Sequence, residues 1–260
     1  IYGQQLMNAY ANVNSPSCWS SSLGTFVSYS WANNSDRPYI NKVYKSGTTP
    51  QLSNETLITG NNNYAGRCVD GVTGNNCNVI TFGDRNNSRP LVAVFNTASP
   101  PVAAVWPQNL HNLDANQNGG VSVCYHATAN KFVAMWHGSA DSTANNEIRA
   151  IVFEASTGAV NISGSVQDVA TVTSSTFDTL MDIHYNSNGE KIVFTYRRNN
   201  ATKIRTASIS GNALVFDDEY EINSGTGSSI HSTINTTKNK VLVMTNLGGS
   251  SVYTSPQTNL

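Results

Sequence analysis

The chain has 260 residues, a formal net charge of −1 and only 12% charged residues. This length suits one large all-β domain or two small ones. The low charge gives no sign of a basic face, so neither nucleic acid nor an anionic membrane surface is expected as a partner. No apolar run approaches the roughly 18 to 20 residues of a membrane span, so no membrane insertion is expected, and no signal peptide is visible.

Short β-branched or aromatic runs between Gly, Asn and Ser turns follow one another along the chain and predict strands. No window has the 3.6-residue apolar period of a helix, so almost no helix is expected. One strand type recurs five times, each time after a short turn such as "GNN" or "GEK", at 26–31, 77–82, 132–137, 192–197 and 241–246.

Each of these strands is followed by a polar turn and a third strand, at 39–45, 91–96, 148–155, 204–210 and 252–255. A fourth, more polar strand is predicted in four of the units, at 51–58, 102–106, 159–167 and 213–222. Upstream of the second strands, five residues occupy equivalent places roughly 50 to 60 residues apart, namely Cys18, Cys68, Cys124, Ile183 and Thr233.

Five units of four strands predict a five-bladed β-propeller of four-stranded antiparallel blades, forming a single domain over 1–260. The blades are expected at about 16–65, 66–120, 121–176, 177–229 and 230–260 plus 1–15. The fifth unit lacks a fourth strand, while 1–15 has no blade of its own. We therefore expect the N-terminal strand to close the ring, which removes two free sheet edges. An extended β-solenoid or a row of hairpins is the alternative.

The four cysteines include no CxxC pair, which disfavours a zinc site. Cys18 and Cys124 are expected in the core, where a thiol behaves as a small hydrophobic group. Cys68 and Cys77 flank "VDGVTGNN" on two strands of one hairpin and are a candidate disulfide. Two packed, unpaired thiols are the alternative.

A partial calcium-loop pattern lies in "DANQNGG", where Asp114, Asn116 and Asn118 match its first half. The carboxylate required at position twelve of such a loop is replaced by Tyr125. An Asn/Gly-rich turn explains the pattern equally well. No metal and no cofactor are therefore predicted.

An aromatic residue lies near the end of the second strand in four units, as Trp31, Phe82, Trp136 and Tyr196. The favoured interpretation is packing between adjacent blades. The functional alternative is a set of binding platforms on which sugar rings stack, with Asn-rich turns supplying hydrogen bonds.

Acidic residues test for an enzyme, since glycosidases need a pair of carboxylates. Asp182 is the only acid placed on a predicted inner strand, whereas Asp70 is expected in a hairpin turn. The acids of 217–221 are expected on a solvated outer strand. A single acid does not make an acid–base pair, so a glycoside hydrolase is the least favoured of three functions.

The segment 182–216 resembles repeats of phage tail and virion β-propellers and of related bacterial surface proteins. The resemblance rests on a tyrosine-bearing strand, a lysine-led strand ending in Tyr-Arg, and a Ser-Gly turn before a strand with Phe, here Tyr185, Lys191, Ile192, Tyr196, Arg197, Ser210, Gly211 and Phe216. It implies a virion or extracellular adhesion role and assigns no functional residue.

The leading prediction is therefore a non-enzymatic structural or receptor-binding protein of a phage, presenting a rigid polar face. Its expected partners are other virion proteins or a host-surface glycan, and its expected location is the virion or the extracellular space. The alternative is a secreted, lectin-like carbohydrate-binding propeller.

Overall fold

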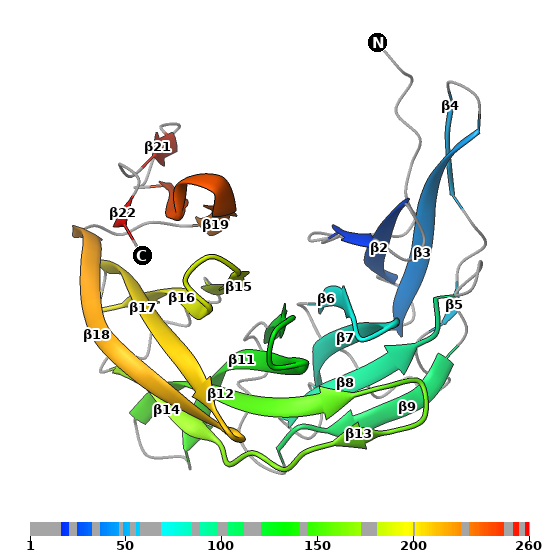
Figure 1. Cartoon of the computed structure of the whole chain (residues 1–260), viewed down its shortest axis with the longest axis horizontal. Coiled ribbons are helices and arrows are strands. Elements are labelled where there is room, and N and C mark those ends of the chain that lie inside the picture. Colours follow the sequence, from blue (N-terminus) through cyan, green and yellow to red (C-terminus); the bar gives the residue numbers. More distant parts are fainter. Residues whose placement is uncertain are drawn as a thin grey trace. The chain divides into compact units, whose positions relative to one another are not determined.

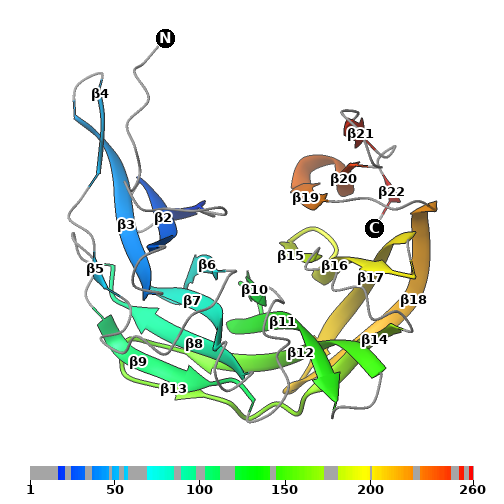
Figure 2. The same ribbon diagram turned by 180° about the vertical axis from the view of Figure 1, so that it is seen from behind.

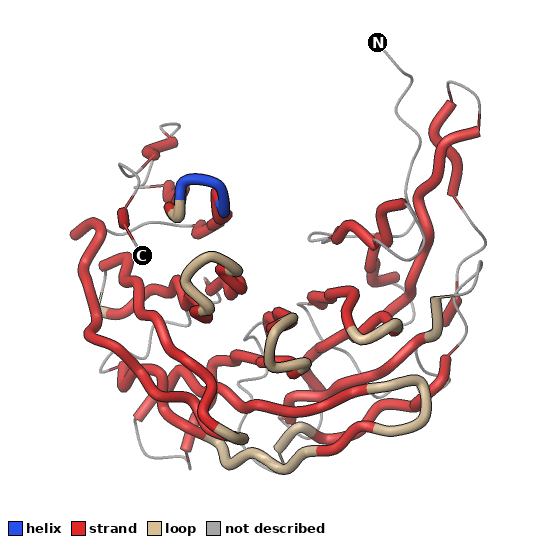
Figure 3. The backbone as a smooth tube through the Cα atoms, in the orientation of Figure 1, coloured by secondary structure: helices blue, strands red, loops and turns tan. Residues whose placement is uncertain are grey.

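The chain folds into antiparallel strands arranged in five sheets (Figures 1 and 3). A computed structural model describes residues 17–20, 25–32, 37–46, 49–52, 56–57, 69–84, 89–97, 103–111, 121–140, 145–172, 181–199, 201–224, 229–246, 252–254 and 258–259. Before residue 70 it describes the backbone alone. The chain divides into two compact units, Ile1–Val121 with Ala155–Asn161, and Ser122–Glu154 with Ile162–Leu260.

The first unit contains two sheets. One has the order β1-β2-β3-β4 with β5 also pairing with β3, in strands β1 (Ser17–Ser20), β2 (Thr25–Ala32), β3 (Arg37–Ser46), β4 (Thr49–Leu52) and β5 (Thr56–Leu57). The other has the order β6-β7-β8-β9, in strands β6 (Val69–Gly74), β7 (Cys77–Asp84), β8 (Arg89–Phe95) and β9 (Ala103–Asn109).

The second unit holds most of the other three sheets. In the first of these sheets, β11 lies between β10 and β12, and β12 also pairs with β14 (Figure 2). The strands are β10 (Val121–His126), β11 (Lys131–Ala140), β12 (Asn145–Ala155) and β14 (Gln167–Val172). The short strand β13 (Val160–Asn161) precedes β14 in the chain. The next has the order β15 (Met181–Asn186), β16 (Lys191–Arg198), β17 (Ala201–Ser210) and β18 (Ala213–Ser224).

In the last sheet, β19 pairs with β20, and two short strands both pair with β20; these are β19 (Ser229–Asn235), β20 (Lys240–Asn246), β21 (Val252–Thr254) and β22 (Thr258–Asn259). The helical turn in the described part of the chain is a single 3-10 turn, η1 (Thr236–Lys238). No helix among the described residues is long and apolar enough to cross a membrane.

The predicted all-β class with antiparallel four-stranded sheets is confirmed. The strands of the five sheets lie within 17–57, 69–109, 121–172, 181–224 and 229–259. The predicted closing strand, 1–15, lies outside the described residues.

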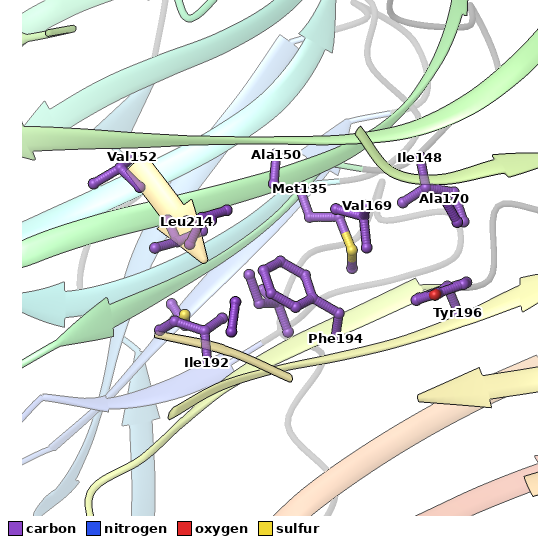
Figure 4. Packing of buried hydrophobic residues seen from close by; sticks show 14 residues of the cluster. Met135, Ile148, Ala150, Val152, Val169, Ala170, Ile192, Phe194, Tyr196 and Leu214 are labelled. Atoms are coloured by element: carbon purple, nitrogen blue, oxygen red, sulfur yellow. The ribbon is translucent and has the colours of Figure 1, made fainter. Parts of the chain in front are cut away.

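The core of the second unit has two layers, one on each face of the sheet β15–β18. On one face, Phe194 packs with Met135 and Val169 of the preceding sheet (Figure 4). On the other face, Val193 packs with Ile230 and Val241 of the last sheet. Since successive residues of a strand point to opposite faces, β16 buries a continuous run instead of alternating between buried and exposed.

Hydrogen bonds between side chains and backbone groups tie β14 to the sheet β15–β18. The Gln167 side chain donates to the Leu214 carbonyl at 2.9 Å and accepts from the Leu214 N–H at 2.5 Å, as a neighbouring peptide group would. Arg205 donates to the Val169 carbonyl at 2.6 Å. A Cβ atom at Gly164 would clash with the Val152 carbonyl oxygen and lie 2.8 Å from the Asn212 carbonyl oxygen. Position 164 therefore requires glycine, because the chain passes close to two other backbone segments there.

The repeated turns explain why "YHATANKFVAMW" and "YNSNGEKIVFTY" are similar. In four sheets the residue directly before the second strand has a positive φ, at Asn76, Asn130, Glu190 and Asn239. Asn tolerates this left-handed conformation better than most residues, so the turns select it. Glu190 is the exception.

The register corrects one part of the sequence repeat. Ile183 pairs with Phe194, the fourth residue of β16, whereas Thr233 pairs with Leu242, the third residue of β20. Ile183 and Thr233 are thus one residue out of step. A one-residue offset reverses the face, and Ile183 is buried while Thr233 is exposed.

Replacing Glu190 with Asn should raise the free energy of unfolding by about 0.5–1 kcal/mol, because it relieves left-handed strain. The measurement is urea denaturation, with an unchanged slope. Asn76→Glu, the reverse exchange at the exposed equivalent position, should lower stability. Equal midpoints for Glu190→Asn and the wild type would contradict this account of the turns.

Candidate functional site

Two aspartates occupy the same place on the first strands of two different sheets. Asp70 on β6 pairs with Thr81, and Asp182 on β15 pairs with Thr195. Each stands four residues before the end of its strand. The prediction that Asp70 lies in a hairpin turn is therefore wrong, because β6 begins at Val69 and its turn begins only at Asn75.

The two aspartates also share a local hydrogen bond. Asp70 Oδ1 accepts the Gly71 N–H at 2.8 Å, and Asp182 Oδ1 accepts the Ile183 N–H at 3.0 Å. The common position was readable in the sequence, since "VDGVTG" and "MDIHYN" both carry Asp second in a six-residue strand. The signal was hidden because the turns that follow differ in length.

Asp182 links two neighbouring sheets. Its Oδ2 accepts hydrogen bonds from both the backbone N–H and the hydroxyl of Ser232 on β19, at 2.8 and 3.1 Å. His184 Nε2, on the same strand as Asp182, lies 3.2 Å from this oxygen. Sequence reasoning did not identify Ser232, because only the packing of β15 beside β19 brings it to the aspartate.

Asp182 is held in its ionised form. Burial alone would raise its pKa, but the hydrogen bond and charge of His184 and the two hydrogen bonds from Ser232 outweigh burial and hold the pKa below its usual range. The Asp182 side chain keeps 22% of its surface exposed. The site thus presents a negative charge at neutral pH that solvent still reaches.

Asp182, His184 and Ser232 do not form a nucleophilic triad. His184 Nε2 lies 2.7 Å from the Ser232 backbone carbonyl and 3.2 Å from Asp182, both of which are acceptors. This nitrogen therefore carries a proton and cannot act as the base for a hydroxyl. The Ser232 hydroxyl donates to the aspartate, so nothing activates it as a nucleophile.

The aromatic residues predicted as sugar platforms lie in the core wherever their side chains are described. Phe82, Trp136 and Tyr196 are fully buried, and the side chain of Trp31 lies outside the described part. The Tyr196 hydroxyl donates to Glu219 at 2.5 Å, and burial is the main reason that its pKa is raised. These rings match the packing interpretation and present no face to a ligand.

The cysteine predictions fall partly outside the described residues. Cys68 lies among the residues not described, whereas Cys77 is buried and its Sγ donates to the Gly74 carbonyl at 3.2 Å. Their disulfide stays a prediction. Cys124 is buried, as expected of a core residue, and the side chain of Cys18 is not described.

The partial calcium loop, Asp114, Asn116 and Asn118, also lies outside the described residues. Among the residues that the structure does describe, no three His, Cys, Asp or Glu side chains gather as metal ligands would. The polar side chains of the candidate site, Asp182, His184 and Ser232, therefore offer a carboxylate, an imidazole and a hydroxyl group.

No protein-family model matches the chain, and no curated protein matches it in sequence. Solved structures do match its fold. They include an oxidoreductase (glucose dehydrogenase) from Thermus thermophilus, with 10% identity, TM-score 0.52, and coverage of 91% of this chain and 78% of the other.

Two further matches are carbohydrate-active enzymes. An endo-arabinase from Bacteroides thetaiotaomicron has 13% identity, and a family-43 β-xylosidase/α-arabinofuranosidase from a compost metagenome has 8%. For both, the TM-score is 0.51, with coverage of 97% of this chain and 95% of the other. The neighbours are β-propeller proteins, and at these identities the likeness establishes the resemblance in fold.

These neighbours correct two predictions. The prediction of a non-enzymatic phage structural protein is contradicted, because the structures that match over 95% of their own length include an endo-arabinase and a β-xylosidase/α-arabinofuranosidase. The resemblance of 182–216 to propeller repeats stands, whereas its link to phage tails and virions gains no support.

We expect the Cys77 thiol to react slowly with alkylating reagents in the folded protein. Burial raises its pKa to about 11, so little thiolate exists at pH 8. Labelling should be about 100-fold slower or more than in urea, where an ordinary cysteine pKa applies. Pulsed iodoacetamide labelling followed by peptide mass spectrometry measures this, and equal rates in both states would contradict the burial.

Proposed function

We propose that this protein is a carbohydrate-active enzyme that cleaves glycosidic bonds, with Asp182 as one of its carboxylates. The observation that carries the proposal is the partly exposed Asp182 carboxylate, which Ser232 and His184 hold where β15 meets β19. Glycoside cleavage uses two carboxyl groups, of which Asp182 would be one.

Asp182 is held ionised by Ser232 and His184, which suits activating a water molecule or stabilising the positive charge that develops on the sugar ring. The group that donates a proton to the leaving-group oxygen would be a second carboxyl group.

The substrate class proposed is a neutral polysaccharide containing arabinose or xylose, with an extracellular location. The low charge of the chain favours an uncharged substrate over an anionic one. The names of two structural neighbours, an arabinase and a xylosidase/arabinofuranosidase, support the choice of sugars.

The test is release of reducing ends from linear arabinan, xylan and arabinoxylan. The wild type should cleave at least one of them, and Asp182→Asn should lower kcat by about 100-fold or more. Asp218→Asn, on the exposed outer strand β18, is the matched control and should retain activity. Binding without cleavage, or an active Asp182→Asn variant, would refute the proposal.

We also propose that the five sheets are the blades of a closed propeller whose last blade takes 1–15 as its outer strand. In support, β21 and β22 both pair with β20, so no described strand follows them outward. Val215 and Tyr220 lie on the face of β18 that continues the core shared with β19 and β20, yet they are 55% and 60% exposed. An outer strand would cover them.

Removing residues 1–15 should then lower the melting temperature by about 5 °C or more, since a chain end that completes a sheet would be lost. Adding the 1–15 peptide should restore part of the loss, and a scrambled peptide should not. An unchanged melting temperature after truncation would exclude closure by this segment.

A further inference from the structure

The two oxygens of the Asp182 carboxylate have unequal surroundings. Oδ2 has three neighbours, the Ser232 N–H at 2.8 Å, the Ser232 hydroxyl at 3.1 Å and His184 Nε2 at 3.2 Å. Oδ1 accepts only the N–H of Ile183, at 3.0 Å, among the described residues. A carboxylate oxygen offers two lone pairs, so Oδ2 is saturated and Oδ1 keeps one lone pair.

From this asymmetry we infer that Ser232 and His184 are positioning residues, which fix Oδ2 so that Oδ1 is the atom that meets the ligand. The ligand class is a hydroxyl donor, either a sugar hydroxyl or the attacking water. The inference rests on the proposed function for the identity of that ligand. The asymmetry itself is independent of any reaction.

The positioning works because its contacts come from two strands. Ser232 belongs to β19 and His184 to β15, so the carboxylate is held across the boundary between two sheets. Rotation of the carboxylate would break the Ser232 contacts and the Ile183 contact together. A group held in this way needs little reorganisation when charge develops near it.

Among the residues that the structure describes, three besides Ile183 contact or pair with Asp182 from its own strand and its neighbours. On its own strand the titratable neighbour is His184, from β19 it faces Ser232, and its cross-strand partner on β16 is Thr195. The contacts of Ser232 and His184 are therefore the ones that favour the ionised carboxylate.

The test uses Ser232→Ala and His184→Gln. Each removes part of what stabilises the ionised form, so Asp182 should titrate at higher pH. The acid limb of the kcat/KM profile should therefore move upward by about half a pH unit or more, while the neutral plateau falls less than about threefold. A purely structural role would lower the whole profile and leave the limb in place. Thr233→Ala, next along β19 on its opposite face, is the matched control.

A second measurement needs no substrate. Carbon-13 NMR of the side-chain carboxyl groups, with the Asp182 signal assigned by its loss in Asp182→Asn, follows the same titration directly. Upward movement in both variants supports the inference even if no polysaccharide is cleaved, which would refute the proposed function alone. An Asp182 titration identical to that of the wild type in both variants would overturn the inference, whatever the activity.

Discussion

The fold depends on burial of both faces of its central strands. Each of these sheets is only about four strands wide and cannot bury its apolar residues alone. In the second unit, the sheet β15–β18 solves this by packing Phe194 against one neighbour and Val193 against the other. Such a sheet buries both of its faces only by packing between two others, so repeating the sheet along the chain supplies the cover that each one needs. This packing holds the first strands of two neighbouring sheets, β15 and β19, side by side, which brings Asp182 and Ser232 together.

The strands themselves were largely predictable from the sequence, because β-branched runs and Asn/Gly turns act within a few residues. Register was not. Ile183 and Thr233 appeared equivalent, yet they point to opposite faces, since their alignment missed a one-residue offset. Asp70 was misplaced for a related reason. The two-residue turn of β6–β7 let "VDG" look like part of a loop, although pairing continues from Val69 to Gly74. Local pattern identifies a strand, whereas cross-strand partners decide where each side chain points.

The sequence alone identified only part of the candidate site. Asp182 was singled out because it stands on a predicted inner strand, but its partners come from sequence distances that no local pattern reports. Ser232 lies 50 positions away, on the next sheet. The aromatic residues show the opposite case. Their repetition was read as packing or as sugar binding, and burial of Phe82, Trp136 and Tyr196 accords with packing. Repeated residues in this chain hold the sheets together, except where a charged group such as Asp182 keeps part of its surface in solvent.

The Gln167 side chain affects how readily copies of the protein could associate through their strand edges in solution. A long outer strand such as β18 offers unpaired peptide groups on which another molecule could grow a β-ladder, the first step toward fibres. At Leu214 both peptide groups that point outward are already occupied by the Gln167 amide. One amide side chain thereby withholds this end of the strand from intermolecular pairing, without adding charge to a chain that carries little of it.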